Sequence, residues 1–222
     1  MLKPKRQTYQ KELKKDPLLE GVNALQHNIE TNSKIYGRAI IGVLAVILVV
    51  IIVSRNMSAK SEEAQIVLNR AMVLFEQGDL DNALLEFEAL YDEFGSTGSG
   101  KLSAYYLGRL YFDRREMDLA QSYMTDYVNN PEMQMLTASA YSILGKLAEL
   151  DKNITSAKTH YQNAVKYSTM ETDRNHHSLS LAAVHIVENE SSEALNILDN
   201  IIQESNPNNP IRAKAERLKG QL

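Results

Sequence analysis

The chain has 222 residues, contains no cysteine or tryptophan, and carries a formal net charge of −4. The lack of cysteine excludes disulfides, thiol nucleophiles and a thioether lipid anchor, and it fits an oxidising compartment. Residues 1–38 contain eight basic and four acidic residues, a net charge of +4, so the remainder of the chain carries −8. That is the wrong sign for a surface that binds the phosphates of nucleic acid.

Residues 1–34 predict a basic cytoplasmic leader. Its first part, Lys3–Lys15, is polar and basic, which is typical of a segment that rests on anionic headgroups. Apolar residues then share one face of an amphipathic helix, namely Leu18, Val22, Leu25 and Ile29. Two interpretations stay open: a cytoplasmic extension of the membrane helix, or a contact surface for the cytosolic face of a membrane partner.

Residues 35–55 predict a transmembrane helix, followed by a linker over residues 56–61. Sixteen uncharged residues separate Arg38 from Arg55, and Ile35–Gly37 extend this stretch towards the roughly 17–25 residues that span a bilayer. The alternatives are a buried core helix and a cleavable signal peptide. A core helix without a polar face needs a larger domain around it, and a signal peptide needs a shorter leader.

The charges that flank the span predict its orientation. Lysine and arginine are concentrated before the span, which places the N-terminus in the cytoplasm and the following domain outside. In a bacterium this orientation corresponds to a single-pass protein of the inner membrane with its larger domain in the periplasm.

Residues 62–209 contain four copies of one unit with a fixed spacing of 37 residues. This spacing separates four alanines from one another, and it also separates the small residues that lie twelve positions before them. The alanines are Ala83, Ala120, Ala157 and Ala194, and the earlier small residues are Ala71, Gly108, Gly145 and Ala182. Apolar residues at three- and four-residue steps, in two stretches separated by a polar turn, predict a helix–turn–helix unit. The fixed period predicts a solenoid of stacked units.

The turns inside the units differ in how well they suit the end of a helix. Gly78 suits a left-handed backbone and Asn189 tolerates it, whereas Arg115 and Lys152 do not. Residues 210–222 predict a charged C-terminal helix that caps the last repeat, because a terminal solenoid unit needs a polar outer side.

The repeats resemble the tetratricopeptide repeat family in their order of small, large and turn residues. The matching positions are Ala71, Leu74, Gly78, Asp79, Ala83 and Phe87 in the first copy; Leu107, Gly108, Tyr111, Ala120 and Met124 in the second; Leu144, Gly145, Ala148, Ala157 and Tyr161 in the third; and Leu181, Ala182, His185, Ala194 and Leu198 in the fourth. The resemblance implies an all-α, tetratricopeptide-type helix–turn–helix solenoid of about four repeats plus the capping helix, after a single N-terminal transmembrane helix. The family period is about 34 residues, and the extra residues are expected in the loops between repeats.

In this family the first helices of the repeats line a concave groove, which implies a set of protein-binding residues. The candidates are Gln65, Leu68, Met72, Phe75 and Glu76 in the first copy; Leu102, Tyr105, Arg109, Phe112 and Asp113 in the second; Ser139, Ser142, Lys146 and Glu149 in the third; and Leu179, Ala183, Ile186 and Val187 in the fourth. This mixture suits an extended or partly folded polypeptide. For each candidate the alternative role is packing against the neighbouring repeat. The asparagines of the family's carboxylate clamp are missing, so binding of a chaperone tail is not inferred.

The sequence contains no pattern that indicates catalysis, a cofactor or a metal. Adjacent histidines such as His176 and His177 point about 100° apart on a helix, so they do not face one ion. His185 occupies a repeat position where a large core residue is expected. We therefore expect no enzyme activity and no cofactor.

The order of elements resembles the family of ancillary subunits of the bacterial SecYEG translocon. That resemblance implies an accessory factor of protein translocation, whose partners are translocon subunits, a membrane-anchored chaperone or secreted polypeptides. The alternative is a structural scaffold of a periplasmic envelope or cell-division complex, and a third interpretation is a cytosolic scaffold in the inverted orientation. The oligomeric state stays open.

Overall fold

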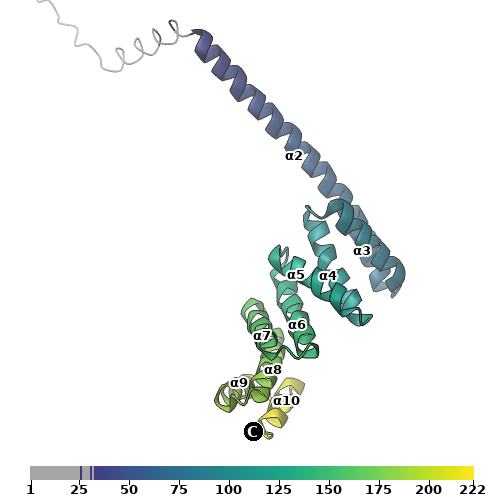
Figure 1. Cartoon of the computed structure of the whole chain (residues 1–222), viewed down its shortest axis with the longest axis vertical. Helices are drawn as coiled ribbons and strands as arrows, with labels where there is room; N and C mark the ends of the chain where they lie inside the picture. Colours follow the sequence, from purple (N-terminus) through teal and green to yellow (C-terminus); the bar gives the residue numbers. More distant parts are fainter. Residues whose placement is uncertain (1–25, 27–30, 32) are drawn as a thin grey trace, which may run out of the picture. The chain divides into compact units, whose positions relative to one another are not determined.

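The computed structural model describes Gln26, Thr31 and residues 33–222, and in this part of the chain all regular structure is helical. The predicted leader with its amphipathic helix lies outside the described residues, apart from Gln26 and Thr31. The chain divides into two units between Asn56 and Met57. Helix α2, Ser33–Glu76, contributes residues to both units (Figure 1).

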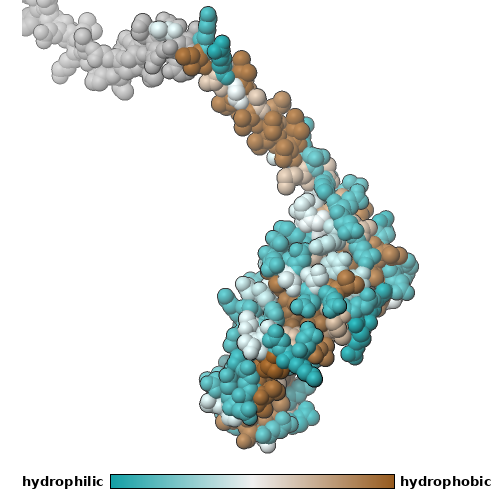
Figure 2. Space-filling model, viewed as in Figure 1, coloured by the Kyte–Doolittle hydropathy of each residue, from teal (hydrophilic) through white to brown (hydrophobic). Residues whose placement is uncertain are grey.

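Helix α2 carries the apolar stretch that the sequence predicts as a membrane span. Of the described helices, it alone is long and apolar enough to cross a membrane, with a mean hydropathy of 2.7 over its most apolar window. The large apolar side chains from Ile40 to Val53 are each 46–67% exposed, as the continuous brown surface in Figure 2 shows. No protein core covers this surface, which argues against a buried core helix. Residues 56–61, the expected linker, lie within α2.

The second unit continues as a row of antiparallel helices. They are α3 (Leu80–Phe94), α4 (Gly98–Asp113), α5 (Met117–Asn129), α6 (Gln134–Leu150), α7 (Ile154–Tyr167), α8 (Glu171–Val187), α9 (Ser191–Glu204) and α10 (Pro210–Lys219). From α3 onward each helix packs on the next, and α4 also contacts α6 while α8 contacts α10 (Figure 1). The first helices of the second and third repeats, α4 and α6, therefore lie against each other, and α8 lies against α10 in the same way.

The small residues of the 37-residue register are the points where paired helices approach most closely. The four alanines that recur every 37 residues, Ala83, Ala120, Ala157 and Ala194, are fully buried. A Cβ atom on Gly108 would lie 2.8 Å from the Cγ atom of Met124, and one on Gly145 would lie 2.7 Å from the Cε1 atom of Tyr161. Met124 and Tyr161 occupy the same register position, as do Phe87 and Leu198, and all four are buried. The burial and close contacts of these register residues confirm the predicted helix–turn–helix repeat.

The extra residues of each unit lie in the helices and not in longer loops. In the third unit, helices of 17 and 14 residues and two three-residue connections fill the whole period. Connections between repeats have only three to five residues. The prediction of lengthened inter-repeat loops is therefore wrong, because the added residues extend the packed surface of the helices.

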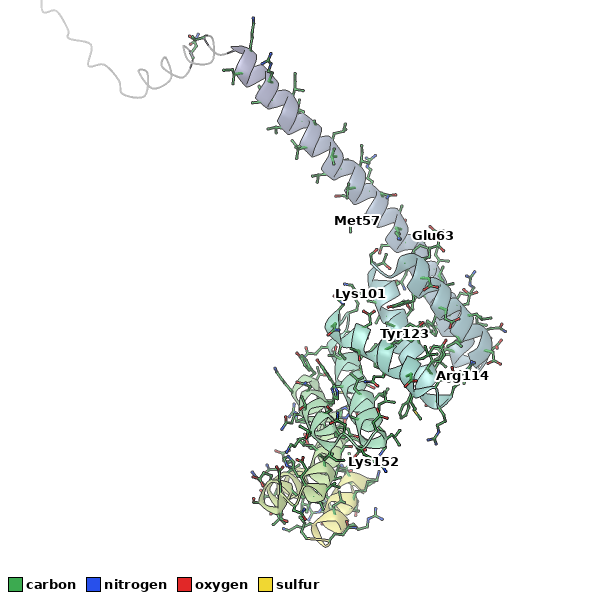
Figure 3. The ribbon with its side chains drawn as sticks, viewed as in Figure 1. Met57, Glu63, Lys101, Arg114, Tyr123 and Lys152 are labelled. Atoms are coloured by element: carbon green, nitrogen blue, oxygen red, sulfur yellow. The ribbon has the colours of Figure 1, made fainter. Side chains whose placement is uncertain are left out.

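All four turns inside the repeats adopt the same left-handed conformation. The φ angles are 79° at Gly78, 66° at Arg115, 60° at Lys152 and 61° at Asn189. At Lys152, which lies at the turn labelled in Figure 3, the backbone N–H donates to the Glu149 carbonyl, and the next N–H donates to the Ala148 carbonyl. This paired arrangement satisfies carbonyls at the end of the helix. The same pair of hydrogen bonds recurs in the other three turns. The stability gained from these bonds exceeds the cost of placing Arg115 and Lys152 in the left-handed conformation.

Replacing Lys152 with glycine is expected to raise the free energy of unfolding by about 1 kcal/mol, because a side chain in the left-handed region costs about 1–2 kcal/mol and glycine avoids most of this strain. The melting temperature of the full-length protein in detergent should rise by about 2–4 °C. Lys152→Ala is the control, since it removes the charge and keeps the Cβ atom. Equal stabilisation by both variants would contradict the backbone explanation.

Helix α10 covers the end of the last repeat. Ala215 is fully buried, and Ile211 and Leu218 pack against the cluster that contains Leu179 and Leu198. Its N-cap Asn209 accepts a hydrogen bond from the Ile211 backbone N–H at 2.9 Å, and Pro210 occupies the first turn, where a missing N–H is harmless. The contacts agree with the capping role proposed for residues 210–222, and α10 also forms one wall of the site described below.

Candidate protein-binding groove

Three of the predicted groove residues, Leu68, Tyr105 and Leu179, belong to the core, and Leu179 also lines the pocket described below. Leu68 is 6% exposed and Tyr105 is 3% exposed. The Tyr105 hydroxyl lies 2.8 Å from the Ser139 hydroxyl oxygen, and its ring contacts the ring of Tyr127 at a centroid distance of 5.5 Å. The structure corrects the prediction at Leu68 and Tyr105, because both side chains are packed in the core and present almost no surface to a ligand.

The aromatic end of the predicted groove is occupied mainly by the chain's own packing. The residues Met72, Phe75, Leu102 and Phe112 are half-buried against the core of the first repeats. The ring of Phe75 meets the ring of Tyr106 edge to face at 5.6 Å, and the exposed Arg109 guanidinium lies 5.8 Å from the Phe75 ring centroid. These contacts cover most of the aromatic surface that the sequence analysis assigns to a binding partner.

Lys146 and Glu149 come together at the edge of an open pocket. The Lys146 ammonium lies 2.8 Å from a Glu149 carboxylate oxygen, and the Tyr161 hydroxyl donates to the same oxygen at 3.1 Å. Burial, together with the Glu149 charge and this hydrogen bond, raises the pKa of the Tyr161 hydroxyl well above its usual value. Tyr161 therefore remains a neutral donor that holds Glu149 in place.

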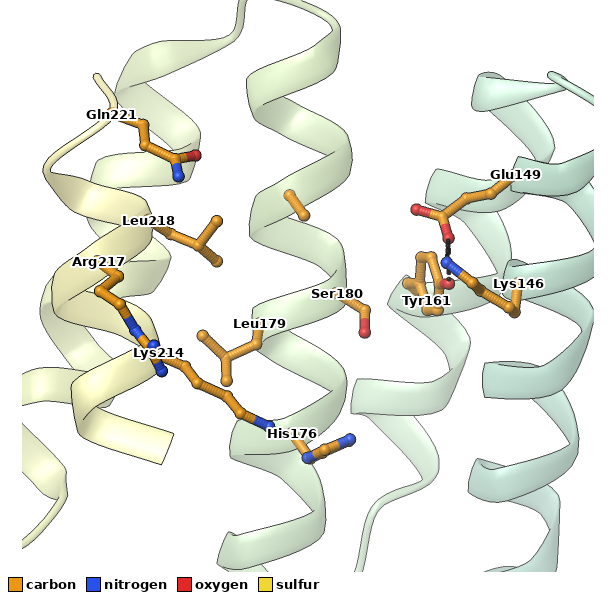
Figure 4. A pocket seen from close by; sticks show the side chains of 11 residues that line it. Lys146, Glu149, Tyr161, His176, Leu179, Ser180, Lys214, Arg217, Leu218 and Gln221 are labelled. Atoms are coloured by element: carbon orange, nitrogen blue, oxygen red, sulfur yellow. Dashed lines mark hydrogen bonds and ion pairs between the residues drawn. The ribbon is translucent and has the colours of Figure 1, made fainter. Parts of the chain in front are cut away.

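This pocket, which we call the C-terminal groove, has a volume of about 580 Å³. Its floor contains the apolar residues Leu179, Ala183 and Leu218, and its charged rim contains Lys146, Glu149, Lys214 and Arg217. Tyr161, His176, Ser180 and Gln221 complete the lining. Figure 4 shows side chains of α8 between those of α10 on one side and those of α6 and α7 on the other. The volume is in the range of pockets that bury small ligands or short peptide segments.

A smaller pocket of about 280 Å³ adjoins Lys146 on the side of α4. Phe112 and Lys146 both line it, together with Leu150. Lys146 therefore borders both pockets, which together form a concave surface lined by residues from α4, α6, α7, α8 and α10. Of the predicted residues, Phe112, Lys146, Glu149, Leu179 and Ala183 border this surface.

Sequence reasoning missed the contribution of α10. Lys214, Arg217 and Leu218 lie in a segment that the sequence predicts as a cap, and no groove position was assigned there. The available signal was the register: α10 begins 39 residues after the start of α8, close to the place where the first helix of another repeat would begin. A capping helix at that place necessarily faces the same groove as the first helices.

The surroundings of His160, His177 and His185 are those of packed side chains and not of metal ligands. Burial lowers the pKa values of His160 and His177, which favours their neutral forms. The His185 Nδ1 atom lies 2.5 Å from a Glu190 carboxylate oxygen. In the part of the chain that the structure describes, no group of three or more histidine or acidic side chains is arranged to hold a metal ion.

The comparisons with known proteins support the fold of the repeat region. No family model matches the chain. The chain is 32% identical over 82 residues to the human E3 SUMO-protein ligase RanBP2, and 33% identical over 69 residues to human RanBP2-like and GRIP domain-containing protein 3. These matches cover 36% and 31% of the chain but only 2% and 4% of the relatives, so the chain spans a small part of their length.

Two solved structures resemble this one over roughly two thirds of the chain. BtubC (BKLC) from P. vanneervenii gives a TM-score of 0.54 with 16% identity, over 66% of each chain. A putative kinesin light chain of Podospora anserina with nearly identical TPR-like repeats gives 0.55 with 15% identity, over 72% of this chain and 89% of the other. The likeness shows a tetratricopeptide-type fold and says nothing further about function.

Proposed function

We propose that this chain is a membrane-anchored protein–protein interaction module that serves the protein translocation machinery as an ancillary factor. In this proposal α2 crosses the bacterial inner membrane once, the N-terminus is cytoplasmic, and the repeats bind clients or chaperones on the extracytoplasmic side. The translocon role rests on the resemblance in element order, and the binding role rests on the groove.

The observation that carries the binding role is the concave surface on either side of Lys146. It combines an apolar floor with charged rims, and it lies on the face shared by α4, α6, α8 and α10. A surface of this kind accepts an extended segment of polypeptide, in which apolar side chains enter the floor and polar groups meet the rim.

The observation that supports membrane anchoring is the exposed aliphatic surface of α2. Water would contact this surface at a high free-energy cost, whereas lipid would cover it. The excess of positive charge before the span supports a cytoplasmic N-terminus. Protease treatment of spheroplasts tests the orientation: the repeats should be digested from outside, and their protection would favour the inverted arrangement.

A photo-crosslinking amino acid at Ser180 tests the function in the native bacterium. Ser180 lines the C-terminal groove, whereas the buried Tyr105 is unsuitable for a probe. The probe should capture translocon subunits, a membrane-anchored chaperone or secreted chains. The control is the same probe at Leu85, which is 61% exposed on α3, and it should not capture them. Capture of one fixed envelope protein at Ser180 would favour the scaffold and overturn the translocation role.

A further inference from the structure

We propose that the C-terminal groove binds a short acidic segment of a partner polypeptide. An apolar side chain of the segment lies on the floor, and its carboxylates pair with Lys214 and Arg217. The proposal rests on the proposed function, because it takes the groove as a protein-binding site and names the chemistry of its ligand.

The charge of the groove is opposite to that of the chain around it. Residues 39–222 carry a net charge of −8, yet the rim of the groove contains three permanent cations and one carboxylate. That carboxylate, Glu149, is already bound to Lys146 and Tyr161. Lys214 and Arg217 therefore give the α10 side of the groove a positive charge that no group in the groove neutralises.

The cations on α10 fall into two groups. Arg212 pairs with Glu216 at 2.9 Å, and Lys219 pairs with Asp199 on α9. Over residues 33–222, no carboxylate oxygen lies within 4.0 Å of the charged nitrogens of Lys214 or Arg217, and the Arg217 Nε atom donates only to the Ala213 carbonyl of its own helix, at 3.3 Å. The unpaired cations are the two that line the groove (Figure 4).

The floor defines the second requirement of the ligand. The partly exposed Ala183 and Leu218, together with the small exposed part of Leu179, form an apolar area next to these cations. A free inorganic anion would satisfy the charges and leave this area in water. A peptide with carboxylates on both sides of an apolar residue satisfies the cations and the floor together, and charge-assisted hydrogen bonds to carboxylates are stronger than those between neutral groups.

The test is a titration of full-length protein in a non-ionic detergent, measured by fluorescence anisotropy of a labelled peptide. The probe is acetyl-Ser-Glu-Asp-Leu-Glu-Asp-Ser-amide, whose blocked ends remove terminal charges. One control peptide has glutamine and asparagine in place of the acids, and another has serine in place of leucine. Both controls should bind more weakly than the probe. Failure of the probe to bind more tightly than the neutral peptide overturns the proposal.

Matched double variants separate the groove from general attraction to a basic helix. Lys214→Gln with Arg217→Gln should weaken binding of the probe about tenfold. Arg212→Gln with Lys219→Gln removes the same charge from the same helix outside the groove, and it should change the affinity less than about twofold. Equal losses in the two double variants would overturn the proposal. Thermal unfolding of both variants verifies that each is folded.

Two further outcomes distinguish the ligand classes and the two proposals. Inorganic phosphate should compete poorly with the probe because it lacks an apolar group, and competition equal to that of unlabelled peptide would overturn the peptide assignment. If Ser180 crosslinks to translocon subunits, a membrane-anchored chaperone or secreted chains in cells but the acidic peptide does not bind, the proposed function stands and this inference fails. If the peptide binds and no crosslink forms, the inference stands and the proposed function fails.

Discussion

Replacing Phe87 with alanine is expected to lower the free energy of unfolding by about 3–5 kcal/mol, the usual cost of removing a fully buried phenyl ring. Phe87 is 0% exposed. Its ring stacks on that of Tyr106 on α4 with a centroid distance of 5.0 Å, and it meets Phe75 edge to face at 6.4 Å. The substitution therefore leaves a cavity at the junction of the first two repeats.

Denaturant titration of the full-length protein in detergent, followed by circular dichroism, measures this effect. Leu85→Ala on the same helix is the control, because Leu85 is 61% exposed and its loss should cost less than about 0.5 kcal/mol. Hydrogen exchange should show earlier opening of α3 and α4 than of α8 and α9, since each repeat of a solenoid contacts only its neighbours. Similar costs for both substitutions would contradict the assigned core.

Replacing Gly145 with valine is expected to lower the free energy of unfolding by about 3 kcal/mol through overpacking. A Cβ atom at this position would lie 2.7–2.9 Å from three atoms of the Tyr161 ring. The ring has little freedom to move, because it is 2% exposed and its hydroxyl is hydrogen-bonded to Glu149 at 3.1 Å. The added side chain would therefore force α6 and α7 apart.

A double variant tests whether the contact with Tyr161 causes this loss. Gly145→Ala combined with Tyr161→Leu reproduces the Ala182–Leu198 pair of the fourth repeat, where both residues are buried. The double variant should be more stable than Gly145→Ala alone, as measured by the same denaturant titration. If removing the ring gives no recovery, the close approach of the two helices is not what requires glycine.

The repeat register connects the fold to the candidate groove. It places α4, α6 and α8 on one face of the second unit, and α10 occupies the next place on that face. The same helix that shields the last repeat from water also brings Lys214 and Arg217 to the rim of the groove. Capping and ligand binding are therefore proposed to share one element.

Parts of this description follow from the sequence alone. The small residues at a 37-residue spacing specify paired helices, since a close approach of two helices leaves room for only glycine or alanine at fixed places. The uninterrupted aliphatic stretch before Arg55 likewise specifies a helix whose surface suits lipid. Both signals are local or strictly periodic, and so they can be read without coordinates.

Other features depend on tertiary packing. Arg115 and Lys152 adopt left-handed turns that their own preferences oppose, because the paired helices fix where each turn must lie. The periodicity of apolar residues marks a face of each helix but does not tell which neighbour covers it. Tyr105 is consequently buried although it shares its helix face with groove candidates. The groove itself arises where α8 lies between α10 on one side and α6 and α7 on the other, an arrangement set by packing between distant segments.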